Sequence, residues 1–403
     1  MHPIAIIVLA CLAHVLSLAP NATFPALIPV FQETWDLSNA EAGWISGIYY
    51  AGYVAGVPVL VTLTDSLDPR RIYVGSAVLA GAASLGFALL AEGFWSALAL
   101  RALAGLGLAG TFMVGLRLVT DRIGGQWQSR GVAWYTAFFS IGLALSVMMA
   151  GEITRLTGWP EAFAAAGLAC AAAVLPVLAL PAVKAGVRIR PEGHALDLRP
   201  ALRNRPALAY NLAYACHIWE LFGWRAWLVA FLVFAFAWHG ADHFAGLAPH
   251  HWASLLLILG LPASILGNEA ALRWGRRRSL SVIMLISTAL ALTLGFASAL
   301  PLALLLALAA VHAVFVMADS ASLTAGAVAA AAPDRKGATM AVHSLLGFTL
   351  AFISPLVAGL VLDLAGGSDP MAWGFALASL GIVAAAGPFI LARMGKTPED
   401  QAR

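Results

Sequence analysis

The chain has 403 residues, of which 61% are hydrophobic and only 11% are charged, and its formal net charge is +3. Soluble domains carry about 25% charged residues, so this composition excludes a water-soluble globular protein. Apolar runs of about 18 residues or more recur along the chain, and each is long enough to cross a bilayer as a helix. These runs are too long and too uniformly apolar for barrel strands. The sequence therefore predicts a polytopic, all-α membrane protein.

Hydropathy and the polar breaks between apolar runs predict twelve membrane helices. The first run lacks the basic segment that begins a signal peptide, so we expect a retained helix. The six helices of the first half are expected near residues 3–30, 42–63, 72–91, 95–119, 131–151 and 160–181. The six of the second half are expected near residues 208–236, 251–271, 279–299, 301–327, 338–362 and 371–393.

A polar segment at residues 184–205 separates the two halves and is rich in Lys and Arg. Almost all other Lys and Arg residues of the short loops fall on the same side, and Arg155 is the exception. By the positive-inside rule, the linker and both termini are expected to be cytoplasmic, in a bacterial inner membrane. The expected domains are six-helix bundles at 1–183 and 206–393, with a cytoplasmic tail at 394–403.

The two halves also resemble each other at an offset near 205 residues, as a duplicated fold should. One match could arise by chance in a chain rich in Ala, Gly and Leu, whereas four in the same order favour duplication. The matches are Arg130-Gly131 with Lys336-Gly337, Gly142 with Gly347, residues 146–151 with 354–359, and residues 84–88 with 293–297.

Two loops at equivalent places carry basic motifs, TDSLDPRR at 64–71 and RWGRRR at 273–278. With twelve helices and a basic central linker, this pattern resembles the major facilitator superfamily. That family carries an Asp, then a Gly, then paired Arg between helices two and three. Asp65, Arg70 and Arg71 match this signature, although Asp68 and Pro69 stand where the Gly is usual.

The second copy of the motif keeps Gly275, Arg276 and Arg277 but has Leu272 at the Asp position. A carboxylate at one helix end can accept bonds from Arg on a neighbour, and the helix dipole adds to the attraction. We therefore expect a cytoplasmic gate that uses Asp65, Arg70, Arg71, Arg276 and Arg277. The alternative is plain positive-inside anchoring, which we favour for Arg278.

The fourth helix reads RALAGLGLA from Arg101, which is similar to the Arg-x-x-x-Gly-x-Gly pattern that the superfamily links to proton coupling. Gly105 and Gly107 are expected to serve helix packing, since no strand precedes them as a nucleotide-binding fingerprint would require. A Gly-Pro pair that the family associates with antiporters is absent, and Ser146-Val147 stands in its place.

Few ionisable residues fall inside the predicted membrane helices, where each costs about 3 kcal/mol or more. They persist where they face a hydrated cavity or find a partner. Three cations and three anions are expected here, so full pairing among them is the alternative to a functional site. They are Arg101, Arg117, Glu220, Arg225, Glu269 and Asp319.

Helix seven carries the most informative stripe, because His217, Glu220 and Trp224 share one face by their spacing. At the repeat offset, Arg225 of this helix corresponds to Asn21 of helix one. Prolines beside Asn21 would bend helix one and free backbone carbonyls to line a cavity. The candidate cavity residues are Asn21, Arg101, Arg117, Tyr214, His217, Glu220, Trp224, Arg225 and Asp319.

Two hypotheses follow for the chemistry of this cavity. Glu220 or Asp319 carries a coupling proton, because a buried carboxyl group favours its neutral form, and Arg101 is a third candidate from the family pattern. The substrate is a small anion held by Arg225, Arg101 or Arg117 in fork geometry. For Arg117, pairing with a protein carboxylate is the stronger alternative, since Asp121 lies four residues on.

We therefore expect a secondary active transporter that works by alternating access and takes up a small organic anion with protons. Proton-antiport efflux of amphipathic compounds is the first alternative, and a non-transporting membrane sensor is the second. No enzyme activity, cofactor or nucleic-acid partner is expected, and the chain is expected to be a monomer. The spacing of His239 and His243 fits a metal pair on a helix, but that region reads as a loop, so no metal site is expected.

Overall fold

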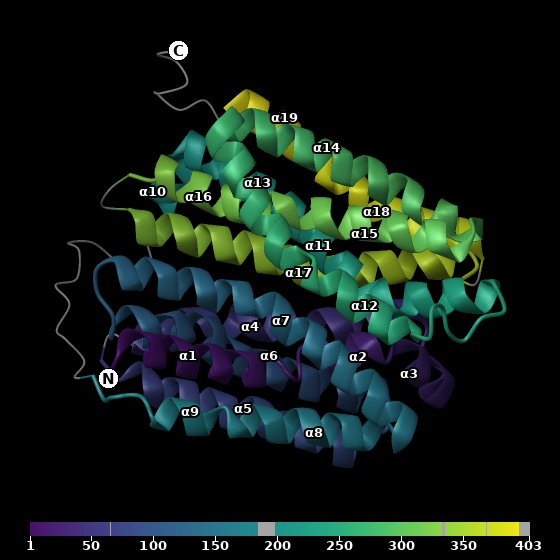
Figure 1. Ribbon diagram of the computed structural model, residues 1–403, viewed down its shortest axis with the longest axis horizontal. Coiled ribbons are helices and arrows are strands. Elements are labelled where there is room, and N and C mark those ends of the chain that lie inside the picture. The colour runs from purple at the N-terminus through teal and green to yellow at the C-terminus, as the bar shows by residue number, and fades with distance from the viewer. Residues whose placement is uncertain (65, 184–197, 333–334, 368, 395–403) are drawn as a thin grey trace. The chain divides into compact units, whose positions relative to one another are not determined.

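A computed structural model describes the chain except for residues 65, 184–197, 333–334, 368 and 395–403 (Figure 1). The helices of the first half are α1 (Pro3–Ser17), α2 (Thr23–Ala26), α3 (Ile28–Trp35), α4 (Asn39–Leu63), α5 (Pro69–Leu90), α6 (Phe94–Thr120), α7 (Gln126–Leu156), α8 (Trp159–Ala172) and α9 (Val174–Leu178). Those that follow are α10 (Arg199–Arg203), α11 (Arg205–Trp238), α12 (Pro249–Ile258), α13 (Gly260–Trp274), α14 (Arg276–Leu294), the 3-10 helix η1 (Phe296–Ala299), α15 (Leu302–Ala318), α16 (Ser320–Ala330), α17 (Lys336–Leu364), α18 (Pro370–Ala384) and α19 (Ala386–Met394).

Among the described residues, eleven helical segments are long and apolar enough to cross a membrane. They coincide with eleven of the twelve predicted helices. The predicted first helix, 3–30, is instead divided into α1, α2 and α3. Proline has no backbone N–H to donate and its ring opposes a continuous helix. The bend expected from the prolines of this segment is therefore confirmed, and it is a full interruption after Ser17.

The interruption leaves backbone groups that a regular helix would pair, and side chains of the same half satisfy them. Ser146 Oγ of α7 donates to the carbonyl of Ala19 at 2.5 Å and accepts from the backbone N–H of Ala22 at 3.1 Å. Thr23 Oγ1 donates to the same carbonyl at 2.8 Å. Buried backbone groups need such partners, so Ser146 holds the broken first segment in place.

The chain divides into two compact units, each described here by itself. The first contains Met1–Arg188 with Leu228–Val233 and Ala245–Ile258. The second contains Ile189–Trp227, Phe234–Phe244 and Leu259–Arg403. The division thus crosses α11 and leaves α12 with the first unit, while the predicted linker 184–205 lies mostly outside the described residues. The predicted six-helix halves stay a prediction.

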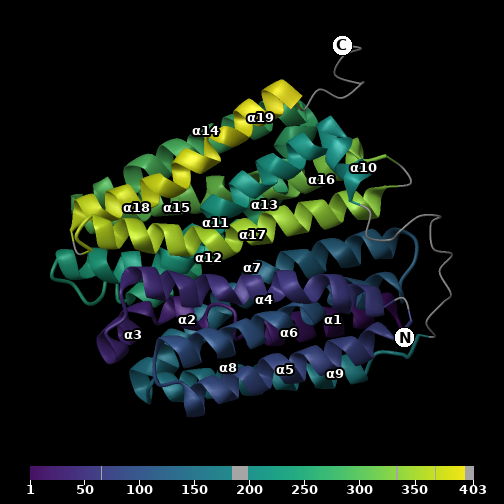
Figure 2. The ribbon, with the colours of Figure 1, turned by 180° about the vertical axis from the view of Figure 1, so that it is seen from behind.

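In the first unit, α6 packs between α4 and α5, and α5 packs in turn against α8 (Figures 1 and 2). Glycines on α6 allow this close approach. A side chain at Gly105 would overlap the carbonyl of Tyr49 on α4, and one at Gly107 would approach the carbonyl of Ser76 on α5 within 2.6 Å. The predicted packing role of both glycines is therefore confirmed.

Replacing Gly105 by Ala is expected to lower the apparent stability of the purified protein, because overpacking a tight contact costs about 1–3 kcal/mol. Gly75 of α5 is the matched control, since a methyl group there would meet no atom within 4 Å. Thermal unfolding in detergent measures both variants. Equal melting temperatures for the two would contradict the packing role of Gly105.

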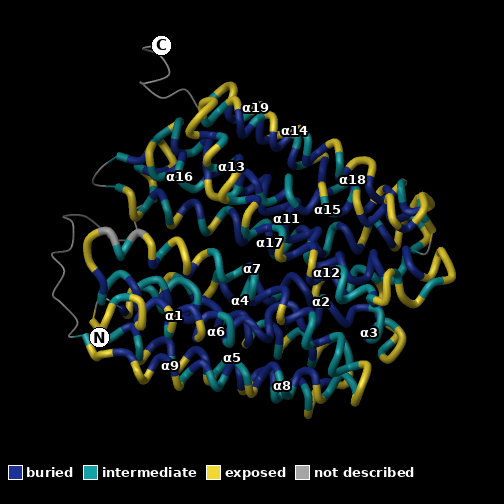
Figure 3. The backbone as a smooth tube through the Cα atoms, viewed as in Figure 1, coloured by how far each residue is buried: buried dark blue, intermediate teal, exposed yellow. Residues whose placement is uncertain are grey.

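In the second unit, α14 packs against α18 and α15, and α13 packs against α15. Buried residues run along the inward faces of these helices, and exposed residues lie at the turns and along outer faces (Figure 3). The ring of Tyr210 on α11 lies against Gly326 of α16, in a core that also includes Leu280, Met284 and Leu323. This packing brings polar residues of α11, α14 and α15 together inside the unit.

Candidate functional site

The carboxylate of Glu220 lies inside the second unit, and the residue is only 3% exposed. Its Oε1 accepts a hydrogen bond from Ser287 Oγ of α14 at 2.7 Å and lies 3.0 Å from His312 Nε2 of α15. The ring of Trp224, about one turn along α11, meets the His312 ring edge-on with centroids 4.8 Å apart. A buried carboxylate without a partner is costly, so the carboxylate and the imidazole together hold the proton or charge at this place.

A second pair of the same kind is formed by Asp319, at the junction of α15 and α16. Its Oδ1 lies 2.8 Å from Nδ1 of His217, and both side chains are buried. His217 precedes Glu220 by three residues on α11, so the two pairs stand on neighbouring turns. The other ring nitrogens, Nε2 of His217 and Nδ1 of His312, have no hydrogen-bond partner among the described residues.

A third histidine of the second unit is enclosed by hydrogen bonds instead of a carboxylate. His343 of α17 stacks on Tyr214 with ring centroids 3.6 Å apart. Its Nδ1 lies 3.1 Å from Asn211 Oδ1, and its Nε2 lies 3.1 Å from Thr324 Oγ1. These contacts join α11, α16 and α17. Tyr214 and His217 of the predicted stripe therefore belong to one polar core with His343, since their own rings lie 5.8 Å apart.

Arg225 is half-buried on α11, five residues beyond Glu220. One guanidinium nitrogen, Nη2, lies 3.3 Å from Sδ of Met317, and the group lies over the ring of Phe222 at 5.4 Å. A thioether and an aromatic face attract a cation without neutralising its charge. The role predicted for Arg225 stays a prediction.

In the first unit, Arg101 of α6 holds the interrupted first segment. Its Nη1 donates to the carbonyl of Pro20 at 2.6 Å and its Nη2 donates to the carbonyl of Asn21 at 3.0 Å. The guanidinium lies over the ring of Tyr49 at 4.3 Å, and the residue is only 2% exposed. No carboxylate forms an ion pair with Arg101 within the part of the chain that the structure describes. Arg101 is therefore a buried cation paired with dipoles alone.

Asn21 lies beside this cation and is itself 2% exposed. The hydroxyl of Tyr50 donates to its Oδ1 at 3.1 Å, which fixes the amide orientation. The amide nitrogen of Asn21 has no hydrogen-bond partner among the described residues. Buried donors are normally satisfied, so the unit presents a buried cation and an available N–H group on neighbouring residues.

His14 on α1 is a further buried group with available nitrogens. It is fully buried and stacks between Tyr135 and Phe112, with ring centroids 4.2 Å and 5.6 Å away. Neither ring nitrogen has a hydrogen-bond partner in the described part of the chain. The first unit therefore contains an imidazole that stacks on aromatic rings, about one turn before the break in the first segment.

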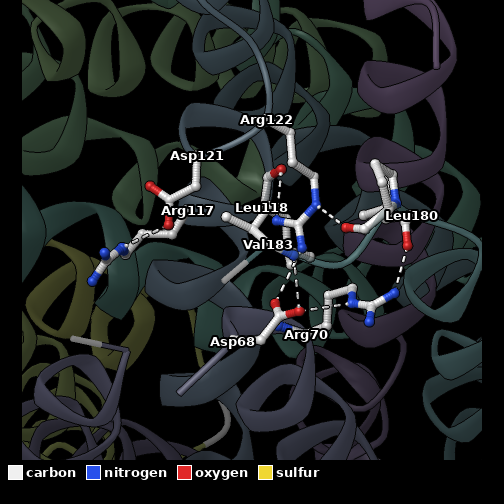
Figure 4. A network of polar contacts seen from close by, with 9 residues as sticks. Asp68, Arg70, Arg117, Leu118, Asp121, Arg122, Leu180 and Val183 are labelled. Carbon is white, nitrogen blue, oxygen red and sulfur yellow. Dashed lines mark hydrogen bonds and ion pairs between the residues drawn. The ribbon is translucent and has the colours of Figure 1, made fainter. Parts of the chain in front are cut away.

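Arg117, near the end of α6, has the local partner that its spacing suggested. Its Nε lies 3.3 Å from Oδ2 of Asp121, and Nη1 also bonds to the hydroxyl of Thr64 at the end of α4. The side chain is half-buried. These contacts place Arg117 in a polar cluster at the helix ends, which Figure 4 shows beside the network around Asp68.

Asp68 is the centre of that network (Figure 4). It caps the N-terminus of α5, and its Oδ1 accepts from the backbone N–H of Arg70 at 3.0 Å. The Arg70 side chain donates to Oδ2 at 3.0 Å, and Arg122 Nη2 donates to Oδ1 at 3.1 Å. The same arginines donate to the carbonyls of Leu180 and Pro181. Asp68 therefore ties the start of α5, the end of α6 and the segment after α9 together.

Burial alone would raise the pKa of Asp68, but backbone and guanidinium hydrogen bonds together hold the pKa of this carboxyl below its usual value of 3.8. The ionised form is thus favoured in the folded state. Its contribution to stability is fully present above the usual carboxyl pKa and is lost as the pH falls through the lower folded-state value. At neutral pH the ionised carboxylate of Asp68 therefore contributes its full stabilisation.

Replacing Asp68 by Asn is expected to lower the apparent unfolding free energy at neutral pH by about 1–3 kcal/mol, because it removes the negative charge that binds Arg70 and Arg122. The variant should also lose the wild-type decline in stability at acid pH. Asp242 to Asn is the control, since that carboxylate is exposed in a loop. A melting curve that matches wild type at every pH would show that the network adds nothing.

Glu152 of α7 lies close to two histidines of α12. Its Oε1 lies 2.9 Å from Nε2 of both His250 and His251, and Arg155 binds its Oε2 at 2.8 Å. Nδ1 of His251 accepts the backbone N–H of Ala248 at 3.1 Å, so the proton of a neutral His251 is on Nε2. A metal would need that nitrogen's lone pair, so this group is a hydrogen-bonded charge cluster.

A comparison with known protein families identifies the family of this chain. A family model described as Major Facilitator Superfamily matches residues 9–267, which is more than half of the chain. The chain belongs to the Major Facilitator Superfamily. The resemblance read from the loop motif and the helix count is thereby confirmed, together with the fold class.

Individual members of this superfamily are only distantly similar to the chain. Protein spinster homolog 1 from Bos taurus is 22% identical over 243 residues, which cover 58% of this chain and 46% of that protein. The niacin transporter NiaP from Acinetobacter baylyi is 27% identical over 134 residues, which cover 33% and 30%. The chain thus spans half or less of these relatives.

The same fold is found in solved members of the superfamily. A bacterial homologue of the human lysosomal transporter Spinster, in an inward-facing and occupied conformation, matches with a TM-score of 0.77. The alignment covers 98% of this chain and 97% of that one at 15% identity. At this identity the likeness shows the fold alone.

The structure describes only part of the superfamily loop motif. Asp65 lies outside the described residues, and Arg70 bonds to Asp68, the residue that stands in place of the usual Gly. Arg71 is exposed and makes no ion pair with the described residues. The gate role of these residues stays a prediction.

The second copy of the loop motif lies at the start of α14. Arg277 donates to the carbonyl of Ala392 on α19 at 3.3 Å, and Arg276 is half-buried beside it. Gly275 precedes them with a φ of 89°, a left-handed conformation that glycine adopts without strain. This turn sets where α14 begins, and the gate role of Arg276 and Arg277 also stays a prediction.

The intramembrane charges differ from the expected list in two respects. Glu269 is exposed on α13, so the expectation that it is buried is wrong. A carboxylate on an outer helix face can lie toward the membrane surface, which apolar spacing cannot reveal. The buried carboxylates Glu220 and Asp319 lie beside histidines, whereas the alternative to a functional site paired them with arginines.

The histidines and their neighbours are the residues that sequence reasoning missed. They are His14, Asn211, Ser287, His312 and His343. The balance of intramembrane charges includes Asp, Glu, Lys and Arg but not histidine. Each missed histidine sits in an apolar run, so a count that included neutral titratable residues would have found them.

Proposed function

We propose that this member of the superfamily is a secondary transporter that takes up a small organic anion together with protons by alternating access. We further propose that it resides in a bacterial inner membrane with both termini in the cytoplasm. Three features support the proposal: a buried cation without a carboxylate partner, two buried carboxylate–histidine pairs, and the names of its relatives.

The single observation that supports an anionic substrate is the environment of Arg101. A buried charge without a full counter-charge is expensive, and the two carbonyls that face Arg101 supply only partial charges. An anionic substrate near the guanidinium complements it, and the amide nitrogen of Asn21 provides a donor beside it. These groups suit a carboxylate, which arginine binds in a fork.

The proton is assigned to the pairs Glu220–His312 and Asp319–His217. In each pair, one proton can be shared between a carboxylate and an imidazole, and the remaining ring nitrogen is available to pass it on. Intramembrane chains of Asp, Glu and His are used for proton relay in transporters. The available nitrogens of His217 and His312 favour coupling over a purely structural role.

The names of the relatives suggest which substrates to test first. Two curated relatives are named niacin transporters or putative niacin/nicotinamide transporters. Nicotinate is a small aromatic monocarboxylate, and nicotinamide is its neutral counterpart of nearly the same shape. The pair therefore separates recognition of charge from recognition of shape.

The test is accumulation of labelled nicotinate, and of a panel of other small carboxylates, in proteoliposomes under an imposed pH gradient. The proposal predicts that an acidic exterior drives accumulation of a carboxylate and that nicotinamide is not accumulated. Extrusion of amphipathic compounds under the same gradient would favour proton-antiport efflux instead. If neither the carboxylates of the panel nor the amphipathic compounds crossed the membrane, the proposal of transport would be wrong.

A ligand screen by thermal stabilisation precedes the flux assay. A ligand at about 100 times its Kd stabilises the folded protein by about 2.7 kcal/mol. Carboxylates that raise the melting temperature, when their amides do not, become the first transport substrates to test.

A further inference from the structure

Each unit contains a groove of nearly the same size on its helix surface. The groove of the first unit is lined by α4, α5 and α6 and has a volume of about 490 Å³. The groove of the second unit is lined by α13, α14 and α15 and has a volume of about 500 Å³. Both fall within the range of about 300–1,000 Å³ that is usual for ligand sites.

The two grooves are equivalent by the internal repeat. At a single offset of 207 residues, nine of the twelve residues that line the first groove correspond to residues that line the second. Leu67 corresponds to Trp274, and Arg71 corresponds to Arg278. Two grooves that recur at equivalent positions of a duplicated fold are a built feature of each unit.

Both grooves are apolar along their length and carry one arginine. In the first, Val59 and Leu63 are 60% and 38% exposed, and in the second, Leu266 and Trp274 are 66% and 65% exposed. Apolar surface of this extent on a membrane-spanning helix faces hydrocarbon. The long apolar lining therefore suits an acyl chain.

The arginines lie at the end of each groove, on the third residue of α5 and of α14. Arg71 and Arg278 are exposed and form no ion pair with the described residues. Both lie in the basic loops, where arginine at a membrane surface attracts anionic headgroups. Each groove therefore combines an acyl-sized apolar lining with a cation at one end.

We infer that these grooves are paired binding sites for an anionic phospholipid of the leaflet that the basic loops face. One acyl chain lies along the apolar lining, and the headgroup phosphate is bound by Arg71 in the first unit and by Arg278 in the second. The inference rests on membrane embedding and on the grooves, and it is independent of the substrate proposed above.

Trp274 makes the second site directly measurable, because bromine on an acyl chain quenches a nearby indole. The protein is reconstituted in phosphatidylcholine vesicles that contain phosphatidylglycerol, with bromine on the chains of one lipid or the other. The Trp274 signal is the difference between the wild type and Trp274→Phe. Brominated phosphatidylglycerol should quench it about fivefold more effectively than brominated phosphatidylcholine at equal mole fraction, the ratio set by about 1 kcal/mol per basic residue at an anionic surface.

Matched variants locate the cause of that preference. Arg278→Gln should abolish it, whereas Arg278→Lys, which keeps the charge, and Arg71→Gln, in the other unit, should preserve it. In the first unit, Leu67→Trp places a reporter at the equivalent position, and its preference should be lost with Arg71→Gln and kept with Arg278→Gln. Equal quenching by both lipids in the wild type, or a preference that survives Arg278→Gln, would overturn the inference.

Discussion

Replacing Glu220 by Gln is expected to abolish accumulation of the substrate under a pH gradient while leaving downhill flux in place. A carboxamide has nearly the shape of the carboxyl group and can still bond to Ser287 and His312, but it cannot take up a proton. The interior concentration of labelled substrate should therefore rise only to the exterior concentration. The measurement is uptake into proteoliposomes with an acidic exterior.

The control for this variant is Glu269→Gln, which removes a carboxylate that is exposed on α13 of the same unit. That variant should accumulate substrate as wild type does. Asp319→Asn tests the second pair separately, since the carboxylate of Asp319 lies beside a different histidine. If accumulation persisted with unchanged pH dependence in both Glu220→Gln and Asp319→Asn, the carboxylate–histidine pairs would have no part in coupling.

Replacing Arg101 by Gln is expected to reduce both apparent stability and affinity for carboxylates. The change replaces the two guanidinium nitrogens that face the carbonyls of Pro20 and Asn21 by the single nitrogen of a shorter carboxamide, and an unsatisfied buried carbonyl costs about 1–3 kcal/mol. Arg101→Lys keeps the charge but lacks the fork geometry, so its stability should be intermediate. Thermal unfolding with and without nicotinate, or the best carboxylate of the screen, measures both effects.

Arg155→Gln is the matched control, because this arginine is exposed and its ion pair with Glu152 is of the kind worth about 0–1 kcal/mol. An Arg101→Gln variant with wild-type stability and undiminished stabilisation by carboxylates would remove Arg101 from the proposed substrate site. Reduced stability with undiminished ligand stabilisation would limit its role to holding the broken first segment.

Structural features that depend on local sequence could be predicted, and the bend of the first membrane segment is an example. Proline spacing indicates that helix one bends, because a missing N–H acts within one turn. The contact of Arg117 with Asp121 could be expected for the same reason, since it joins residues four apart on one helix. Neither inference requires knowledge of which helices are neighbours.

Partners that come from distant parts of the chain could not be predicted in this way. Glu220 is 67 residues from Ser287 and 92 residues from His312, and only the packing of α11, α14 and α15 brings them together. Charge counting suggested arginine partners because opposite charges were assumed to pair. Histidine can also pair with a buried carboxylate, but a neutral histidine is not counted in a charge balance.

The loop before α5 illustrates a third case, in which a carboxylate outside the family signature binds one of the predicted arginines. A carboxylate was expected to bind the basic residues of this loop, and Asp65 was chosen from the family signature. The carboxylate that binds Arg70 is Asp68, because an Asp before Pro69 occupies the N-cap position and points its oxygens at the first turn. Local capping geometry would have identified it.

The most direct test of proton-coupled anion uptake is the direction of proton movement that the substrate itself causes. Proteoliposomes are loaded with a pH-sensitive dye and set to the same pH on both sides, and the best carboxylate from the binding screen is added outside. Coupled uptake predicts acidification of the interior that is absent with the matching amide and absent in Glu220→Gln. Substrate entry with no change in internal pH, or with alkalinisation, would contradict the account.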